Sequence, residues 1–380
     1  MSRSDISTTP APGTNVDVAG RAGLAEAAIW VIQSYRAGEN TQLLGLAERL
    51  GRPFRTVSLG YRRSAGLLGL LRRATLAGLD AASRARIAGP WPELVISAGL
   101  RNEPVCAYIR RASGGRTRVV FLGRTWCRHD ALDLLVTTPQ YRIEPASGVL
   151  VNLFTQHRVT PERLADAARR QAGRFDGRPR PLIAVLLGGS SGPYVLGPAS
   201  AGRLARELDA LVRVTGGSLA VSSSSRTPEA FCCALFAELG PEAFVYRWRP
   251  DDPDNPYYAM LARADLVVVT GDSVAMLSEA AATGKPVLIF DIPTGPGGDV
   301  STAARFYRWM MRWLPRRLTR DVGLFHRQFV AAGYGRLLEA EARPADWREP
   351  GSRVLATTDQ TVARVLGLLD PGAARPRQGS

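Results

Sequence analysis

The sequence predicts an α/β protein with two Rossmann-like domains, each built around a doubly wound parallel sheet, facing each other across a cleft in a GT-B-like arrangement. Short runs rich in β-branched apolar residues alternate with helix-forming segments along most of the chain, which is the pattern of βα units. Several of these runs are apolar without alternation, as in strands buried on both faces. The chain has 380 residues, and a domain averages about 150 residues, so we expect two domains.

The predicted strands fall into two sets, and the region between them runs from a helical segment into the Gly-, Pro- and Arg-rich stretch GRFDGRPRP. That composition is typical of a hinge. The first set comprises residues 28–33, 55–59, 94–98, 118–122, 132–138 and 149–154, and the second set comprises residues 182–187, 218–223, 243–247, 266–270 and 287–291.

The domain organisation follows from these two sets. Residues 1–20 and 371–380 have the composition of a disordered leader and a disordered tail. Between them we expect an N-terminal domain at 21–165, a linker at 166–181, a C-terminal domain at 182–340 and a helical segment at 341–370. In that last segment a helix over residues 359–369, capped by Thr357 or Thr358, can pack on either domain.

The net charge is strongly positive but is spread along the chain. Lys and Arg total 49 against 34 Asp and Glu, which gives a formal net charge of +15. Lys285 is the sole lysine, and the arginines are scattered from Arg3 to Arg377. Because a basic patch must be local to indicate an electrostatic binding site, this distribution disfavours nucleic acid as the partner.

Cysteine and histidine are too few and too irregularly spaced to indicate a disulfide framework or a metal centre. An apolar run of the ~18 to 20 residues that a membrane span needs is absent, and the N-terminus has no apolar signal core. We therefore expect a cytoplasmic protein with no bound metal and no cofactor. The residues concerned are Cys106, Cys127, Cys232, Cys233, His129, His157 and His326.

The segment over residues 265–286 carries the most information about function. A buried strand ends in Gly271-Asp272-Ser273, and a helix follows that also contains Met276, Ser278 and Glu279. The helix N-terminus then lies beyond the carboxyl edge of the sheet, where phosphates bind. Ser273 can donate to a phosphate, and Glu279, about two turns further on, can accept hydrogen bonds from ribose hydroxyls. The alternative is that Asp272 or Ser273 only caps the helix and that Glu279 is solvated.

A second segment, Arg36-Ala37-Gly38-Glu39-Asn40-Thr41, joins the first predicted strand to a helix over residues 41–50 that Asn40 or Thr41 would cap. This loop, with Gly38 and Asn40, is predicted to face the cleft. Glu39 is therefore a candidate general base for an acceptor hydroxyl, or else a solvated carboxylate favoured by the helix dipole. His129, before the strand at 132–138, is an alternative base, or a simple loop histidine.

Gly188 and Gly189 follow the first strand of the second set, where glycine allows the backbone to approach a ligand closely. The pattern is not GxGxxG and lacks the acidic residue expected about 20 positions later, which disfavours a dinucleotide cofactor.

Ser225, Arg226 and Thr227 precede a helix over residues 228–239, with Thr227 as its N-cap and Pro228 as its first residue. Arg226 can pair with a diphosphate, or it can be an ordinary surface arginine.

Asn255 and Tyr257 lead into a further helix, where an aromatic ring can stack on a nucleobase or pack against the sheet. The nearby Asp251-Asp252-Pro253-Asp254 is predicted to be a turn instead of a DxD metal motif.

Two segments, 62–86 and 305–320, interleave arginine with leucine or aromatic residues. Such a segment suits a helix lying in an anionic membrane interface. It can equally bind single-stranded nucleic acid or pack on its own domain.

The run Ser278-Glu279-Ala280-Ala281-Ala282-Thr283-Gly284-Lys285-Pro286 resembles the donor-site helix of glycosyltransferases with the two-Rossmann GT-B fold. That resemblance implies that Glu279 holds the ribose of a nucleotide sugar and that Ser273 holds its diphosphate.

Four blocks further resemble the mitochondrial fission (elongated mitochondria) factor family, whose bacterial branch is regarded as GT-B-type glycosyltransferases. The strand at 132–138 is often followed in that family by a His-Asp pair, whereas here Pro139-Gln140-Tyr141 follows. The four blocks are RAGENTQLLGLAERLG from Arg36, Leu187-Gly188-Gly189, Ser224-Ser225-Arg226-Thr227-Pro228, and Asn255-Pro256-Tyr257 running into ADLVVVTGDSVAMLSEAAATGKPV.

Together these features favour a metal-independent glycosyltransferase that moves a sugar from a nucleotide-diphosphate donor to an envelope glycan or lipid acceptor, peripheral to the inner face of the plasma membrane. The family resemblance also implies an alternative, a non-catalytic membrane-surface adapter that recruits a dynamin-like GTPase, as plant members do. A third hypothesis is a sugar-nucleotide epimerase, which would form product without an acceptor.

Overall fold

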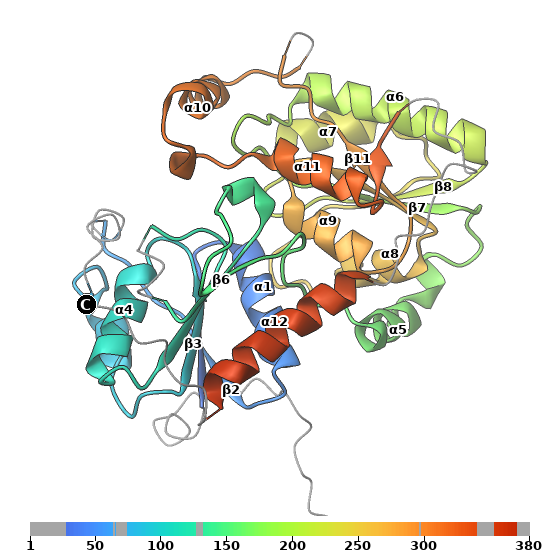
Figure 1. Cartoon of the computed structure of the whole chain (residues 1–380). Coiled ribbons are helices and arrows are strands. Elements are labelled where there is room, and N and C mark those ends of the chain that lie inside the picture. Colours follow the sequence, from blue (N-terminus) through green and yellow to red (C-terminus); the bar gives the residue numbers. More distant parts are fainter. Residues whose placement is uncertain are drawn as a thin grey trace, which may run out of the picture.

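A computed structural model of the protein describes residues 28–63, 65, 74–126, 132–295, 298–339 and 353–370. Most of the basic segment at 62–73 lies outside these ranges. Within them the chain forms two six-stranded sheets in which every strand pair is parallel, with helices on both faces (Figure 1). The prediction of two doubly wound parallel sheets is thereby confirmed.

The first sheet has the strand order β2-β1-β3-β4-β5-β6. Consecutive residues of its strands point into two separate cores: Val31 and Ile96 into one, Trp30 and Val95 into the other. This alternation explains why the strands are apolar throughout. Its elements are β1 (Ile29–Ile32), α1 (Ala37–Arg49), β2 (Phe54–Val57), α3 (Ala81–Arg86), β3 (Leu94–Ala98), α4 (Glu103–Ala112), β4 (Arg118–Leu122), β5 (Leu134–Thr137), η3 (Pro139–Tyr141) and β6 (Val149–Val151).

The second sheet has the order β12-β11-β10-β7-β8-β9 and contributes to the largest core. Its elements are α5 (Pro161–Arg170), η4 (Ala172–Arg174), β7 (Leu182–Leu186), α6 (Pro198–Thr215), β8 (Ser218–Ser222), α7 (Glu229–Glu238), β9 (Phe244–Tyr246), α8 (Tyr257–Arg263), β10 (Leu266–Thr270), α9 (Val274–Ala281), β11 (Val287–Phe290), α10 (Thr302–Trp313), η5 (Arg316–Leu318), α11 (Val322–Ala331) and β12 (Arg336–Leu337).

The last helix, α12 (Arg353–Leu369), returns to the first sheet after the chain has built the second (Figure 1). Val365 is buried in the core that α1 covers. Asn152 Nδ2 donates to Thr361 Oγ1 at 2.8 Å, which ties α12 to the segment that joins the two sheets. A second link between the sheets runs from the Thr155 amide to Ser278 Oγ of α9, at 3.1 Å.

Several predicted helix starts are wrong. Helix α1 begins at Ala37 with Arg36 as its N-cap, so Asn40 and Thr41 lie inside it. Helix α7 is capped by Pro228 instead of Thr227. Helix α12 begins at Arg353, which places Thr357 and Thr358 in its interior. Strand β12, of two residues, was not predicted.

Lys285, the sole lysine of the sequence, holds the C-terminal end of α8. Its Nζ donates to Leu261 O at 2.7 Å and to Ala262 O at 2.6 Å. These carbonyls lie in the last turn of α8, where backbone acceptors have no partner within the helix. Lysine suits the position because one ammonium can point two donors at adjacent carbonyls.

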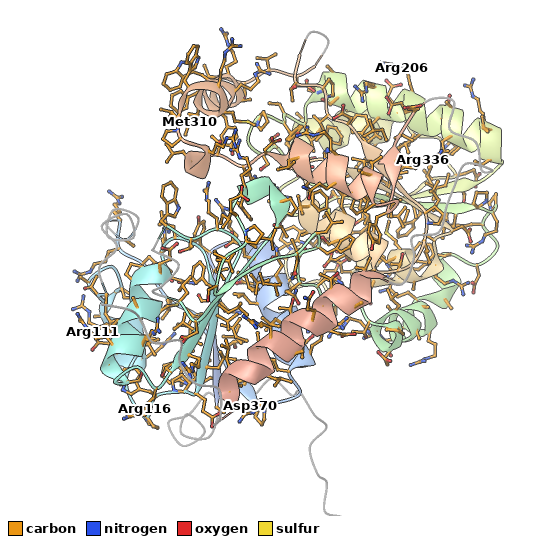
Figure 2. All side chains as sticks on the ribbon, viewed as in Figure 1. Arg111, Arg116, Arg206, Met310, Arg336 and Asp370 are labelled. Carbon is orange, nitrogen blue, oxygen red and sulfur yellow. The ribbon has the colours of Figure 1, made fainter. Side chains whose placement is uncertain are left out.

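We therefore predict that Lys285→Met, which keeps the apolar stem, lowers the free energy of unfolding by about 1–3 kcal/mol. Urea denaturation measures this change. The matched control is Arg206→Met on the exposed face of α6, labelled in Figure 2, for which we expect less than about 0.5 kcal/mol. Equal stability of the two variants would contradict the capping role.

Candidate functional site

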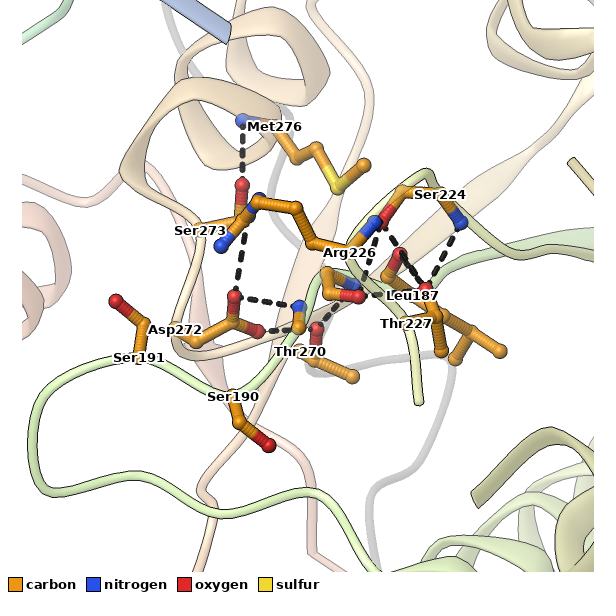
Figure 3. Close-up of polar contacts among 12 residues, drawn as sticks. Leu187, Ser190, Ser191, Ser224, Arg226, Thr227, Thr270, Asp272, Ser273 and Met276 are labelled. Atoms are coloured by element: carbon orange, nitrogen blue, oxygen red, sulfur yellow. Dashed lines mark hydrogen bonds and ion pairs between the residues drawn. The ribbon is translucent and has the colours of Figure 1, made fainter. Parts of the chain in front are cut away.

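Part of the predicted site lies at the carboxyl edge of the second sheet, where Figure 3 shows Arg226, Thr227, Asp272, Ser273 and Met276. From β7 the chain builds β8 and β9 on one side, and then crosses to place β10 on the other side of β7. The point where the strand order reverses is where open α/β sheets bind ligands. The loops that follow β7, β8 and β10 all meet there.

The carboxylate of Asp272 joins these three loops. Its side chain is fully buried. Oδ2 accepts from the Gly189 amide at 2.8 Å and faces Arg226 Nη2 at 3.3 Å, and Oδ1 accepts from Thr270 Oγ1 at 2.8 Å. Burial raises the pKa of Asp272, and the positive charge of Arg226 opposes that rise. Asp272 therefore acts as the centre of the loop scaffold and holds the Arg226 guanidinium over the edge of the sheet.

The two glycines are explained by this packing. A Cβ on Gly188 would lie 2.4 Å from the Asp272 carboxylate oxygens, and a Cβ on Gly189 would lie 2.3 Å from Arg226 O. Neither contact is sterically tolerable. The Gly-Gly pair is thus needed for the approach of Asp272 and of the Arg226 backbone.

The loop after β8 is fixed by hydroxyl groups. Ser224 Oγ and Thr227 Oγ1 donate to Gly188 O at 3.0 Å and 2.6 Å. Ser225 lies exposed at the tip of the loop. The Arg226 side chain remains 48% exposed despite its contact with Asp272, so the guanidinium has donors available to a ligand.

Ser273 is the N-cap of α9, and its Oγ accepts from the Met276 amide at 3.5 Å. Ser273, and not Asp272, therefore caps α9. The N-terminus of this eight-residue helix lies at the loop edge beside Arg226 (Figure 3). The partial positive charge of the helix end and the guanidinium thus act in the same region.

Glu279 is buried inside α9. Tyr257 OH donates a short hydrogen bond to Glu279 Oε2. Burial raises the pKa of Glu279 to about 7, while the hydrogen bond from Tyr257 and the charge of Arg158 act in the opposite direction. The alternative that Glu279 is an ordinary solvated carboxylate is therefore wrong, and a buried carboxylate with a raised pKa is a typical feature of a functional site.

The remaining predicted residues of this edge have internal partners. Ser278 Oγ accepts from the Thr155 amide and donates to Val274 O at 2.8 Å. Asn255 Oδ1 accepts from the Tyr257 amide at 3.0 Å, at the start of α8. Gly271 lies under His326, whose Nε2 is 2.7 Å from Gly271 O.

The predicted acceptor loop lies at the carboxyl edge of the first sheet. Glu39 Oε2 accepts from Ser34 Oγ, and its Oε1 pairs with Arg36 Nη1 at 3.3 Å. Asn40 clamps Ser34 from both sides, with Oδ1 accepting from its amide at 2.7 Å and Nδ2 donating to its carbonyl at 3.0 Å. Gly38 is exposed in the first turn of α1. His129, the other candidate base, lies outside the described residues.

Two residues of the site were not found from the sequence. Thr270 ends β10 and donates to Asp272, and a buried polar residue at a strand end is a signal that could have found it. Arg320 donates to Ser191 Oγ and acts electrostatically on Asp272. Nothing in the sequence distinguishes Arg320 from the many other arginines.

Over the described ranges, His, Cys, Asp and Glu form no group of three that could hold a metal ion. Asp252 has a structural partner instead, accepting from Tyr246 OH at 2.7 Å. No helix in the described part of the chain is long and apolar enough to cross a membrane.

The family described as "Mitochondrial fission ELM1" matches residues 37–360. "Mitochondrial fission protein ELM1" of Arabidopsis thaliana is 29% identical over 248 residues, 59% of this chain and 57% of the plant protein. The chain thus spans little more than half the length of that relative. "Uncharacterized protein RP120" of Rickettsia prowazekii is 25% identical over 303 residues, 70% of this chain and 83% of that protein.

Solved structures with a similar arrangement include a UDP-GlcNAc 2-epimerase from Methanocaldococcus jannaschii, at 11% identity and a TM-score of 0.48, covering 89% of this chain and 98% of that one. The E. coli ADP-heptose lipopolysaccharide heptosyltransferase II has 12% identity and a TM-score of 0.43, covering 90% and 98%.

The buried position of Glu279 predicts a pH-dependent stability. Its pKa is about 7 in the folded chain against an ordinary value of 4.5. The folded state therefore binds the proton more tightly, so the stabilisation is fully present below about pH 4.5 and is lost as pH rises through about 7. We predict that Glu279→Gln, which keeps an acceptor for Tyr257, gains roughly 2 kcal/mol of stability relative to wild type between about pH 5 and pH 8.

Chemical denaturation of both proteins across this range measures the difference. Glu238→Gln, an exposed substitution at the end of α7, is the control and should show no such trend. A difference between Glu279→Gln and wild type that stays constant with pH would contradict the buried carboxylate.

Proposed function

The chain belongs to the mitochondrial fission ELM1 family, and from that premise we propose that it is a glycosyltransferase with a nucleotide-diphosphate sugar as donor. The observation that carries the proposal is the junction of Arg226, the α9 N-terminus and buried Glu279 at the strand-order reversal of the second sheet. Each group suits one part of such a donor.

The diphosphate is assigned to Arg226 and the first turn of α9. Arg226 offers a planar fork of donors that matches a phosphoryl group, and its contact with Asp272 already fixes its direction. As the bond to the sugar breaks, negative charge grows on the departing diphosphate. A fixed guanidinium and helix end stabilise that charge without reorganising.

The ribose is assigned to Glu279. It lies six residues beyond Ser273, which at 1.5 Å per residue is about 9 Å along the helix axis. That separation leaves the diphosphate at the helix start and the ribose hydroxyls beside the second turn. Tyr257, hydrogen-bonded to the same carboxylate, is then positioned to contact the nucleoside. The general base stays a proposal, with Glu39 assigned to the acceptor hydroxyl.

We predict that at least one nucleotide-diphosphate sugar raises the melting temperature of the protein. At a ligand concentration one hundred times Kd the stabilisation is about 2.7 kcal/mol. Arg226→Gln should abolish most of it, since a charge-assisted contact contributes about 1.5–3 kcal/mol. Arg213→Gln, an exposed arginine of α6 in the same half of the chain, is the control and should keep the full shift.

A panel of UDP-, GDP-, ADP- and dTDP-sugars in thermal-shift measurements tests this prediction. Stabilisation by none of them would favour the adapter alternative of the family. An equal shift in Arg226→Gln would contradict the assignment of the diphosphate to Arg226. Conversion of the sugar nucleotide with no acceptor present would favour the epimerase alternative.

We further propose that α10 contacts an anionic membrane, which would bring the protein to a lipid-linked acceptor. Phe306, Trp309 and Trp313 recur at helical spacing on one face and are 59%, 49% and 66% exposed. Phe306 and Trp309 stack with ring centroids 5.6 Å apart. The opposite side is fixed to the protein through buried Ala304 and through Tyr307, whose hydroxyl accepts from the Arg320 amide at 2.8 Å.

The positive charge of α10 and the residues around it favours contact of this face with an anionic membrane. Residues 301–320 contain six arginines and no acidic residue. Arg305, Arg308 and Arg312 form a stripe one residue behind the aromatic stripe, hence about 100° around the helix. Aromatic rings with flanking cations suit an anionic lipid interface. Figure 1 shows α10 at the periphery of the molecule, away from both sheets.

We predict that the protein floats with vesicles of phosphatidylcholine and phosphatidylglycerol, and that Trp309→Ser with Trp313→Ser lowers the bound fraction at least about tenfold, because each ring contributes roughly 1.5–3 kcal/mol on burial. Trp248→Ser, at another exposed tryptophan, is the control and should bind as wild type does. Absence of flotation, or an α10-dependent dimer in solution, would contradict the membrane contact.

A further inference from the structure

The carboxyl edge of the first sheet has the same topological position as the donor edge, and it is basic. From β1 the chain builds β2 on one side, and then places β3 on the other. The strand order therefore reverses between β1 and β3, at the type of position where open α/β sheets bind ligands. The loops at that position contribute Tyr35, Arg36 and Arg101.

Two guanidinium groups lie against one exposed ring at this edge. The Cζ of Arg36 is 5.2 Å and the Cζ of Arg101 is 4.9 Å from the ring centroid of Tyr35. The Tyr35 side chain is 51% exposed. The ring attracts each cation, but the two cations repel each other. An anion bound between them would offset that repulsion and use the donors that both groups present to solvent.

The local acidic groups do not neutralise this edge. Glu39 pairs with Arg36, whereas Arg101 forms no ion pair with any described residue. The carboxylate of Glu103 is buried and accepts from the Trp126 amide at 2.8 Å. Helix α1 has 13 residues, and its N-cap residue, Arg36, makes no side-chain capping hydrogen bond. The helix dipole therefore adds positive potential beside Arg36.

Positive charge continues from this edge toward the donor edge. Arg124, after β4, lies 6.0 Å from the Tyr141 ring centroid. Burial lowers the pKa of Arg124, and the charges of Arg320 and Arg36 lower it further. Arg320 belongs to the second half of the chain and contacts Ser191 in the loop after β7. Arginines from both halves thus lie within electrostatic range of one another.

We propose that Tyr35, Arg36 and Arg101 bind a phosphoryl or diphosphoryl group of the acceptor, so that the acceptor is a phosphorylated molecule. The assignment to an acceptor rests on the proposed glycosyltransferase function, whereas binding of a phosphoryl group at this edge does not. The fork of each guanidinium matches phosphoryl oxygens, and Arg124 contributes longer-range attraction. Glu39, paired with Arg36, then stands beside the bound group, where a general base for the acceptor hydroxyl is needed.

Isothermal titration of the full-length protein with inorganic pyrophosphate tests the site. Arg101→Gln is the cleanest variant, because that side chain has no ion pair to break among the described residues; Arg36→Gln is the second. We expect each to weaken pyrophosphate binding by about tenfold or more, and wild-type binding to weaken as ionic strength rises. Arg116→Gln is the matched control: Arg116 lies just before β4, at the opposite edge of the same sheet (Figure 2), and should leave the affinity unchanged.

The outcomes separate this site from the donor site. Unchanged affinity in Arg101→Gln and Arg36→Gln, or a loss confined to Arg226→Gln, would overturn the inference while leaving the donor proposal intact. Dependence on Arg101 in a protein that no nucleotide sugar stabilises would support the phosphoryl site and refute the donor assignment. If the inference is right, nucleotide-sugar stabilisation should persist in Arg101→Gln.

Discussion

The buried carboxylate of Asp272 is the interaction on which the proposed donor site depends. A carboxylate without water is strongly destabilising unless its oxygens are paired. Here the partners are an amide in the loop after β7, a guanidinium in the loop after β8 and a hydroxyl at the end of β10. Asp272 itself lies in the loop after β10, so one side chain fixes the mutual positions of the three loops. The same packing requires Gly188 and Gly189 and aims Arg226 at the edge of the sheet. Asp272 thus organises cationic and backbone donors around the edge of the sheet.

The carboxylate of Glu279, in contrast to that of Asp272, is buried with few hydrogen-bond partners. Tyr257 supplies one hydrogen bond, and burial raises the pKa of the carboxyl group to about 7. Retaining such a group lowers stability at neutral pH, a disadvantage that the surrounding apolar core must offset. A ligand with hydroxyl donors would complete its hydrogen bonding, which is the physical reason for assigning ribose to this position. In the proposed donor site, Asp272 therefore organises the loops, and Glu279 is the acid assigned to the ligand.

The sequence predicted the fold well, because runs such as LVVVT at β10 are apolar on both faces and fit only a covered parallel sheet. It offered Ser273, together with Asp272, as an alternative cap of α9, since a capping interaction spans only three residues. It could not predict that Asp272 pairs with Gly189 or that Tyr257 pairs with Glu279, because those contacts join segments far apart in sequence. The helix starts at Ala37 and Glu229 were missed because the expected capping side chains, Asn40 and Thr227, make loop contacts instead. The amphipathic α10 was visible in the sequence, but only the structure shows that its aromatic face is exposed.

Two sheets with reversed strand order present two polar edges, one with Arg226 and Glu279 and the other with Arg36 and Arg101. The central claim is that the first of these edges binds a nucleotide-diphosphate sugar. The most direct measurement is a crystal structure of the protein with the sugar nucleotide that stabilises it most. The account predicts the diphosphate against Arg226 and the first turn of α9, with ribose hydroxyls on Glu279. A nucleotide bound at any other place, or at this edge without contact to Glu279, would contradict it.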